Sequence, residues 1–456
     1  MPLQKNQVLT LRVERLSSDG SGVAHSPDGE TVFIPGAAPG DEARVRIVKD
    51  CKRYAFGILD EVLTPSPDRI PVDCAVAGPC GGCSLRHLDY AAELRAKQEN
   101  VADAFARIGG LDVPVLPIVG SPEVNRYRNK VQFPVGVDKS GKPCIGFYAG
   151  RTHRIVPCPD CRLQPGVLNE IGNALCAFFA EKGIQPYSEE TGRGLVRHIF
   201  LRRGAHSGQI MVCLVCTRAK LPSAEELCTR LKAQFAEITT ILLNVNAKNT
   251  NVILGTETHT LYGQGYIEDT LCGVPVQLGP LSFYQVNTLA AEQLYGIAAQ
   301  YAQLTPDDLL LDLYCGMGTI GLSMAAHCRE LIGVEIVPEA IESAKANAAR
   351  MGADVAAKSR FFCADAGQAA TRLAAEGLQP DIVMLDPPRK GCDEATLSAV
   401  VRMSPRRVVY VSCNPATAAR DAAWLEQNGY HAEKVQPVDL FPRTRHCECV
   451  LSFSKV

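Results

Sequence analysis

Reactive side chains follow apolar runs in the last third of the chain. The run Ile382-Val-Met-Leu leads into Asp386-Pro-Pro-Arg-Lys, and the run Arg407-Val-Val-Tyr-Val leads into Ser412-Cys413-Asn-Pro. If both runs are parallel strands, Asp386 and Cys413 lie at one carboxyl edge, where ligands bind in open α/β folds. A thiol there can act as a nucleophile, although most buried cysteines are inert. Glu448, just before the apolar run Cys449–Phe453, is either a base or an ordinary solvated carboxylate.

A glycine-rich segment follows an earlier apolar run and predicts a ligand loop. The run Leu309-Leu-Leu-Asp312 leads into Leu-Tyr-Cys-Gly316-Met-Gly318-Thr-Ile-Gly321, and the next predicted strand ends in Glu335. Glycines at a strand-to-helix turn let the backbone approach a ligand, and a carboxylate after the second strand can bind ribose hydroxyls. The acidic Asp312 favours a ligand with a cationic amino acid end over a pyrophosphate. S-adenosylmethionine fits these charges better than NAD does.

A thiol and a carboxylate beside a methyl donor indicate one particular chemistry. Carbon 5 of uracil is too weak a nucleophile to accept a methyl group directly, but addition of a thiolate to carbon 6 activates it. A base must then remove the proton from carbon 5 so that the thiolate can leave. Positive charge near Cys413 would increase its thiolate fraction, and the candidates are Arg389, Arg443 and Arg445.

The cysteines of the first half predict a metal site. The segment Cys74-x5-Cys80-Gly-Gly-Cys83 places three thiols within ten residues, and a fourth ligand must come from elsewhere. The chain has 19 cysteines and no apolar signal segment at its start, which argues against a disulfide framework. Four thiolates suit an iron–sulfur cluster and zinc equally well, so the residues alone leave both metals open.

The order of predicted elements divides the chain into three parts. Short alternating runs between residues 6 and 63 predict a small β-barrel, and the proline-rich segment Thr64–Pro71 is a linker. Residues 91–108 form a helical pattern ended by Gly109-Gly110, and the middle region mixes strands and helices. From about residue 287, apolar strands alternate with Ala-rich helices, which predicts a doubly wound parallel sheet. We therefore expect domains at 1–64, 65–275 and 276–456, with helix 91–108 able to pack on the third.

Composition excludes some classes and points to a polyanionic partner. Hydrophobic residues make up 46% of the 456 residues and charged residues 21%, which excludes a disordered chain. No apolar run is long enough to cross a bilayer, so we expect a cytoplasmic protein without a membrane partner. The net charge is −2, yet residues 121–220 hold 15 Lys and Arg against 7 Asp and Glu. Such a region is either an ordinary solvated face or a nucleic-acid footprint, with candidate phosphate contacts at Arg126, Arg128, Lys130, Arg197, Arg202 and Arg203.

Taken together, these motifs resemble the RNA uracil-5-methyltransferase family, specifically its RumA/RlmD ribosomal-RNA type. The resemblance spans essentially the whole chain. It rests on Ser282-Phe-Tyr-Gln285-Val-Asn, the Asp312 glycine loop, Gly333-Val-Glu335, Leu385-Asp386-Pro-Pro-Arg-Lys-Gly, Ser412-Cys413-Asn-Pro-Ala-Thr and the tail from Phe441-Pro to Glu448. It implies that Cys413 is the nucleophile and Glu448 the proton-abstracting base. It also implies S-adenosylmethionine contacts from Gln285, Tyr314, Glu335 and Asp386, and less firmly from Thr319 and Asp365.

The resemblance also implies roles for the N-terminal half. The N-terminal segment matches the family's TRAM domain, an oligonucleotide-binding (OB-like) barrel that would hold RNA. The cysteines match the family's [4Fe-4S] site, with Cys74, Cys80, Cys83 and Cys161 as ligands. Cys158 competes with Cys161 for the fourth position, and zinc is the alternative metal. Phe283 is expected either to stack on a base or to be a core aromatic residue.

The resulting prediction is an α/β enzyme with a Rossmann-like S-adenosylmethionine-dependent methyltransferase domain, a TRAM barrel and a mixed α+β central domain. It would methylate carbon 5 of a specific uridine in 23S ribosomal RNA, before ribosome assembly is complete, giving 5-methyluridine. Because the transfer-RNA branch of the family typically lacks the barrel and the cluster, their presence favours ribosomal RNA. The alternatives are uracil-5 methylation of tRNA, methylation of an exocyclic base amine, a non-catalytic iron–sulfur RNA-binding factor, and NAD-dependent oxidation. No obligate protein partner is evident, and the oligomeric state is open.

Overall fold

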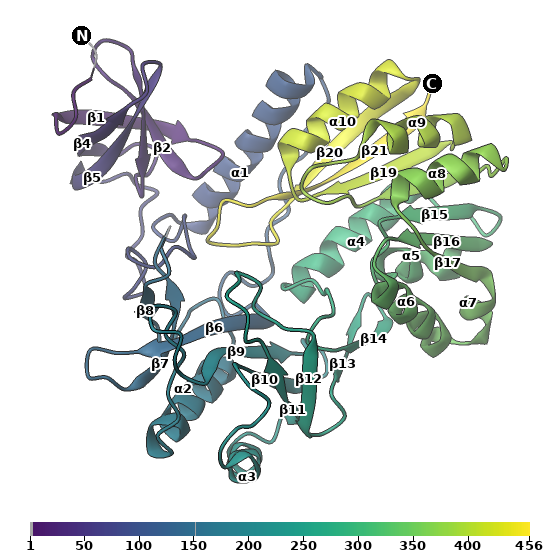
Figure 1. The fold of residues 1–456 in the computed structure, drawn as a ribbon. Coiled ribbons are helices and arrows are strands. Elements are labelled where there is room, and N and C mark those ends of the chain that lie inside the picture. The colour runs from purple at the N-terminus through teal and green to yellow at the C-terminus, as the bar shows by residue number, and fades with distance from the viewer. Residues whose placement is uncertain (1–2, 151) are drawn as a thin grey trace.

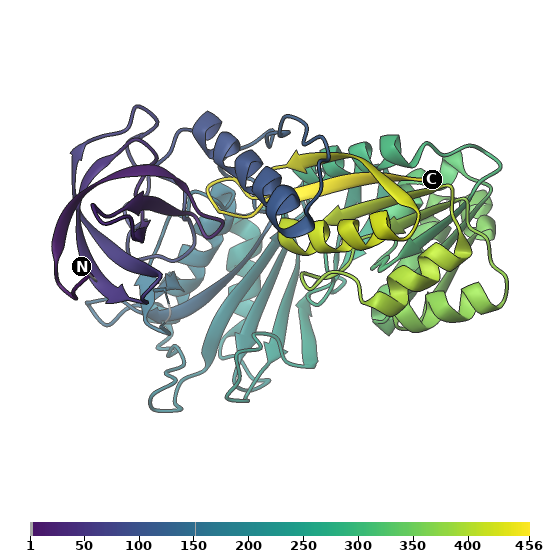
Figure 2. The same ribbon diagram turned by 90° about the horizontal axis from the view of Figure 1, so that it is seen from above.

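The computed structural model describes residues 3–150 and 152–456. A closed barrel lies at one end of the molecule and a sheet flanked by helices at the other, with helix α1 between them (Figures 1 and 2). The barrel strands follow the order β1-β2-β3-β5-β4. Their bounds are β1 Val8–Leu16, β2 Ser21–His25, β3 Thr31–Pro35, β4 Glu42–Asp50 and β5 Tyr54–Thr64. The predicted N-terminal barrel is confirmed.

Alternation of side chains creates the barrel interior. In β4, Ala43, Val45 and Ile47 point inward and are fully buried, while the residues between them are exposed, as expected for a strand with a period of two. Gly57 on β5 permits the close packing, because a Cβ atom there would lie 2.3 Å from Val45 Cγ1.

Helix α1 (Tyr90–Ala104) begins where predicted and continues as the π-helical turn η1 (Phe105–Gly109). The Asp89 side chain caps it by accepting hydrogen bonds from the backbone N–H groups of Ala91 and Ala92. Gly110 ends it in a left-handed conformation, with φ of 62°. Phe105 and neighbouring residues of α1 belong to the same hydrophobic cluster as one face of the C-terminal sheet.

The central region is built on a seven-stranded sheet of order β12-β11-β10-β9-β6-β7-β8. Its strands are β6 Lys130–Val137, β7 Pro143–Tyr148, β8 Ile155–Pro157, β9 Val196–Arg203, β10 Ile210–Cys216, β11 Ile238–Val245 and β12 Glu257–Tyr262. Helices α2 (Gly166–Glu181) and α3 (Ala224–Gln234) pack on one face. The hairpin of β13 (Ile267–Leu271) and β14 (Val274–Leu278) follows.

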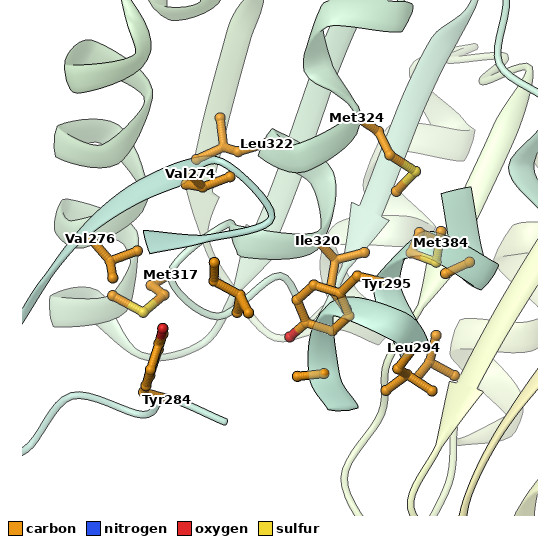
Figure 3. Packing of buried hydrophobic residues seen from close by; sticks show 14 of the residues in the cluster. Val274, Val276, Tyr284, Leu294, Tyr295, Met317, Ile320, Leu322, Met324 and Met384 are labelled. Atoms are coloured by element: carbon orange, nitrogen blue, oxygen red, sulfur yellow. The ribbon is translucent and has the colours of Figure 1, made fainter. Parts of the chain in front are cut away.

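The opposite face of the central sheet packs toward the C-terminal domain. Met211 and Cys213 of β10 share a hydrophobic cluster with the β13–β14 hairpin and with Leu294 and Tyr295 of helix α4 (Thr288–Ala302). Figure 3 shows part of this cluster, with side chains of the hairpin, α4 and the glycine-loop region packed together. A continuous apolar layer therefore connects the central and C-terminal regions.

The C-terminal sheet has the order β17-β16-β15-β18-β19-β21-β20. Its strands are β15 Leu309–Leu313, β16 Glu330–Glu335, β17 Ser359–Cys363, β18 Ile382–Leu385, β19 Arg407–Ser412, β20 Tyr430–Val438 and β21 Glu448–Lys455. The further helices are α5 Thr319–Met324, η2 Ala325–His327, α6 Pro338–Met351, α7 Ala353–Lys358, α8 Ala366–Ala375, α9 Glu394–Met403 and α10 Pro415–Gln427. The first five strands are parallel, which confirms the predicted doubly wound α/β class.

Burial on both faces explains the continuous apolar strands. Leu310 belongs to one hydrophobic cluster, whereas Leu309 and Leu311 belong to the cluster on the other face. The sheet differs from a purely parallel one at its last two strands, because β21 is antiparallel to both β19 and β20. The short connection of residues 439–447 cannot make the crossover that a parallel pair requires.

Within the described residues, no helix is both long and apolar enough to cross a membrane.

Candidate active site and cysteine cavity

The glycine loop after β15 has the backbone that a tight turn requires. Tyr314, Gly316 and Gly318 have φ values of 66°, 55° and 80°, and Gly318 precedes α5 directly. Gly321 lets α5 lie against the strand, since a Cβ atom there would lie 2.8 Å from Asp312 Oδ2. Its backbone N–H instead donates to that oxygen at 3.0 Å. The predicted strand–loop–helix arrangement is thus present, and Asp312 is held beneath the loop.

Three carboxyl groups lie near one edge of the sheet, because Asp312 and Glu335 belong to β15 and β16 and Asp386 directly follows β18. Glu335 accepts hydrogen bonds from the backbone N–H groups of Gly316 (3.2 Å) and Val337 (3.0 Å). Asp312 is buried, and its Oδ1 has no hydrogen-bond partner. Burial raises the pKa of Asp312 to about 8, and the charges of Asp386 and Glu335 contribute to the increase. A cationic ligand would relieve this repulsion, so the crevice fits the charge predicted for S-adenosylmethionine.

Tyr295 of α4 connects several of the predicted cofactor residues. Its buried phenol lies within hydrogen-bonding reach of the side chains of Thr319 and Gln285. Burial raises the pKa of Tyr295, and the charge of Asp386 contributes to the increase. Figure 3 shows the Tyr295 ring beside Ile320. Sequence reasoning missed Tyr295 because an aromatic residue in an apolar helix is typical of a core position.

Two other predicted cofactor residues make contacts away from this group. The Tyr314 hydroxyl lies 3.4 Å from Thr396 Oγ1 of α9. Asp365 caps α8 by accepting a hydrogen bond from the Gln368 N–H at 3.1 Å. Both residues lie at the carboxyl edge of the sheet, directly after β15 and close to the end of β17.

The predicted nucleophile and base lie opposite each other at the other side of this edge. Ser412, the last residue of β19, pairs with Cys449 of β21. Cys413 follows Ser412, and Glu448 precedes Cys449. Continuing the antiparallel register by one pair therefore sets Cys413 opposite Glu448. The interaction of the two groups contributes to a raised pKa of the Cys413 thiol.

Burial and charge govern the titration of this pair. Burial, together with the charge of Asp386, raises the pKa of Glu448 to about 8, and the charge of Arg389 opposes the rise. Burial likewise raises the pKa of the Cys413 thiol, with contributions from Glu448 and Asp386, and a hydrogen bond from Arg389 opposes the rise. An accessible cation therefore lies against both reactive groups, at the end of the Asp-Pro-Pro-Arg segment.

Arg389 is the only one of the three candidate arginines that contacts Cys413 in the described part of the chain. The guanidinium of Arg443 instead donates to Leu88 O at 2.7 Å and lies 3.6 Å from Glu93. The positive charge of Arg445 lowers the pKa of Asp19 and the pKa of His446. The expectation that Arg443 or Arg445 lowers the pKa of Cys413 is thus wrong, because the 439–447 loop turns these side chains toward the N-terminal half.

The cysteines of the N-terminal half surround one cavity of about 290 Å3. Its walls include all four predicted ligands and the competing fifth thiol: Cys74, Cys80, Cys83, Cys161 and Cys158. The Cys158 thiol donates a hydrogen bond to Cys161 and lowers the pKa of Cys161 to about 6. Four cationic side chains also line the cavity, and they can offset the negative charge of a thiolate-bound metal centre: Arg86, Arg128, Lys130 and Arg162.

The spacing of the thiols bears on which metal fits. Across residues 3–150 and 152–456, no three His, Cys, Asp or Glu side chains are close enough to hold a metal ion. A zinc ion with Zn–S distances of about 2.3 Å holds its sulfurs about 3.8 Å apart. Each sulfur of a [4Fe-4S] site binds a different iron, so the sulfurs lie farther apart. The all-thiol lining of the cavity fits either centre, so the choice between a [4Fe-4S] cluster and zinc stays a prediction.

Several basic residues that were predicted to contact phosphate instead donate hydrogen bonds to backbone carbonyls of the protein. Arg197 is buried and donates to Asn246 O and Lys248 O, and Arg202 is 1% exposed and donates to Gly279 O and Ser282 O. Arg126 donates to Cys161 O and Gln164 O. For Arg197 and Arg202 the expectation is wrong, because their guanidinium groups lie in the interior. Phe283 is 73% exposed and is therefore not a core residue.

Comparison with known proteins places this geometry in context. Residues 205–456 match the family model described as tRNA (Uracil-5-)-methyltransferase, and residues 2–59 match the TRAM domain. Proteins named uncharacterized RNA methyltransferase from Halalkalibacterium halodurans and Bacillus cereus are 43% and 41% identical. These matches cover 98% and 100% of this chain and 97% and 98% of the relatives.

A solved structure has the same overall arrangement. It is the Pyrococcus abyssi tRNA (uracil-54, C5)-methyltransferase in complex with S-adenosyl-L-homocysteine. The TM-score is 0.78 at 27% sequence identity, and the match covers 98% of this chain and 100% of that chain.

The contact between Arg389 and Cys413 predicts a shift in thiol reactivity. In Arg389→Met, the pKa of the Cys413 thiol should rise further, because an opposite charge and a hydrogen bond to the thiolate are lost. At a fixed pH below that pKa, alkylation by iodoacetamide should slow about tenfold, as read by mass spectrometry of the Cys413 peptide across a pH series. The adjacent exposed Lys390→Met removes the same charge and is the control. Equal shifts in both variants would contradict a specific Arg389 contact.

Proposed function

The chain belongs to the uracil-5 RNA methyltransferase family, and we propose that Cys413 and Glu448 carry out its chemistry on a uridine. It is a methyltransferase that uses S-adenosylmethionine. The observation that carries the proposal is the register of β19 and β21, which sets the thiol opposite the carboxylate. Asp386 and Arg389 act on both groups electrostatically.

The reaction begins with the Cys413 thiolate, which forms a bond to carbon 6 of the uracil ring. The electron pair of the 5,6 double bond becomes available at carbon 5, and bound S-adenosylmethionine supplies the methyl group there. Glu448 then removes the proton from carbon 5, the double bond re-forms and the Cys413 thiolate leaves. Arg389 favours the thiolate before addition and after release. A raised pKa makes Glu448 a stronger base once it is ionised.

The methyl donor would be held by the side chains of the crevice. Glu335 would accept hydrogen bonds from the ribose hydroxyls, and Asp312 and Asp386 would face the cationic end. Gln285 and Thr319, which lie beside the Tyr295 phenol, would orient the donor between these carboxylates. Tyr314 and Asp365 would complete the site at the edge formed by β15 and β17.

The cysteine cavity would hold a [4Fe-4S] cluster bound by Cys74, Cys80, Cys83 and Cys161, with zinc as the alternative metal. Support comes from the shared cavity, the all-thiol donor set and the surrounding cations. When bound, the cluster would tie the Cys74–Cys83 segment to the loop after β8. No step of methyl transfer is an oxidation or a reduction, so the cluster would have a structural role.

We propose 23S ribosomal RNA as the substrate, with a uridine flipped out of its stack into the crevice. Support comes from the RumA/RlmD type of cysteine pattern, and the TRAM barrel supports RNA binding in general. A tRNA uridine is the second candidate, because the Pyrococcus abyssi enzyme is named for tRNA and matches 98% of this chain. Possession of a barrel therefore does not by itself distinguish the two RNAs.

The covalent mechanism predicts distinct behaviour of two variants. Cys413→Ala should bind RNA but form neither 5-methyluridine nor a covalent complex with 5-fluorouridine RNA, because carbon 6 receives no nucleophile. Glu448→Gln should form the adduct but release it slowly. Denaturing gels and nucleoside mass spectrometry measure both effects. Cys363→Ala, which removes an exposed thiol, is the control, and full activity of Cys413→Ala would exclude the mechanism.

The metal proposal predicts the content of protein purified without oxygen. Iron and acid-labile sulfide should each approach about four per chain for a [4Fe-4S] cluster, and Cys83→Ala should lose them. Cys144→Ala, a cysteine outside the cavity wall, should retain them. One zinc per chain without sulfide would identify the alternative metal and reject the cluster.

The RNA proposal predicts which molecule loses its modification in cells. Without this gene, 23S ribosomal RNA should lack 5-methyluridine at one or two positions, as mapped by mass spectrometry, and re-expression should restore it. Loss from tRNA alone would leave the chemistry intact but would reject ribosomal RNA as the substrate.

A further inference from the structure

The 439–447 loop connects β20 to β21 and ends at Glu448. Four consecutive backbone carbonyls of this loop accept hydrogen bonds from four different segments of the chain. The pairs are Leu440 O with Asn287 Nδ2 (3.0 Å), Phe441 O with Lys97 Nζ (3.2 Å), Pro442 O with the Tyr127 hydroxyl (3.0 Å), and Arg443 O with the N–H groups of Ser84 and Leu85 (3.0 and 3.1 Å). Three of these segments, around Ser84, Lys97 and Tyr127, precede the C-terminal domain, and the fourth donor, Asn287, caps α4. In Figure 2 the loop reaches past α1 toward the N-terminal half.

Lys97 of α1 makes the charged contact among these. Its ammonium group lies 2.7 Å from Glu93 Oε1 and 2.7 Å from Asp439 Oδ1, and all three side chains are at most 1% exposed. The Tyr90 hydroxyl donates to the other Asp439 oxygen at 3.0 Å. The two carboxylates raise the pKa of Lys97 against the effect of burial. The lysine is therefore charged, and Asp439 is held by two side chains of α1.

Asp439 lies next to the strand pair that carries Glu448. Val438, the last residue of β20, pairs with Glu448, the first residue of β21. Asp439 directly follows Val438, and its Oδ1 also accepts from the Phe441 N–H at 3.0 Å. Through Asp439, Lys97 thus holds the β20–β21 hairpin next to the Val438–Glu448 pair.

We propose that Lys97 is a positioning residue for the removal of the carbon 5 proton. It keeps Asp439, and through the β20–β21 pair Glu448, at the distance from Cys413 that proton transfer requires. The inference rests on the proposed role of Glu448. The thiol directly follows β19 and lies outside the loop, so addition of Cys413 to the ring does not depend on Lys97.

This separation assigns Lys97 to a single step. When Glu448 is displaced, the carbon 6–sulfur bond and the methyl group are already formed, but the carbon 5 proton has no acceptor. The electron pair of the carbon 5–hydrogen bond then cannot restore the double bond, and the thiolate cannot leave. A loosened loop therefore makes the methylated adduct accumulate. Displacement of a catalytic group by about 1 Å costs on the order of a hundredfold in rate.

The test compares Lys97→Met with Arg95→Met on the same helix. Arg95 is exposed and pairs with Asp68 at 2.9 Å, so its loss leaves the loop untouched. Each variant is mixed with uridine RNA and S-adenosylmethionine and quenched on a denaturing gel. Lys97→Met should turn over about ten- to a hundredfold more slowly and show a strong RNA–protein band, whereas Arg95→Met should match the unmodified protein.

Tyr127→Phe keeps the test valid if the Lys97 variant fails to fold. It removes only the hydrogen bond to Pro442 O, leaves the buried charges paired, and should show a smaller accumulation of the same band. Glu448→Gln is run in parallel. The positioning role alone would be overturned if Glu448→Gln shows the RNA–protein band but the other variants do not. This outcome requires that the band is absent from folded Lys97→Met or, if that variant does not fold, from Tyr127→Phe. No band in any variant would overturn the proposed role of Glu448 as well.

Discussion

A buried ammonium group between two carboxylates joins the N-terminal half of this protein to its catalytic edge. Lys97 contacts Glu93 on its own helix and Asp439 at the end of β20. Removing one partner of such a buried pair costs about 3–5 kcal/mol, because a charge is left without compensation. The contact therefore constrains where α1, the cysteine segment and the central sheet can lie relative to the C-terminal sheet. Neighbouring hydrogen bonds from Tyr127, Ser84 and Leu85 act on the same loop.

Several buried carboxyl groups lie close together at the carboxyl edge of the C-terminal sheet. Asp312, Asp386 and Glu448 each have a raised pKa, with burial as the main cause. Such repulsion is costly in the free protein and is relieved when a cation enters. In the proposed site, the sulfonium group of the methyl donor would supply that cation beside Asp312 and Asp386. Arg389 supplies positive charge at Cys413 and Glu448, which opposes the rise in the pKa of each group.

Fewer arginines are free to contact RNA than the charge count indicates. Arg197 and Arg202 bind backbone carbonyls in the interior, where they stabilise the central sheet. Arg128 and Lys130 line the cysteine cavity. The match of a tRNA enzyme over nearly the whole chain means that architecture alone does not select the RNA. Phe283, which is 73% exposed, is one side chain that remains free to contact RNA.

The sequence by itself determined the barrel, the helix after residue 90 and the α/β sheet, because periodicity, caps and glycines act locally. It also determined that Asp386 and Cys413 share an edge, since residues after parallel strands meet there. Only the tertiary structure decided that Arg389, not Arg443, contacts Cys413, that Tyr295 lies among cofactor residues, and that Lys97 reaches Asp439. These outcomes depend on side-chain directions and on contacts across 342 residues of chain. Composition and spacing carry no information about such contacts, because burial and pairing arise only when distant segments pack.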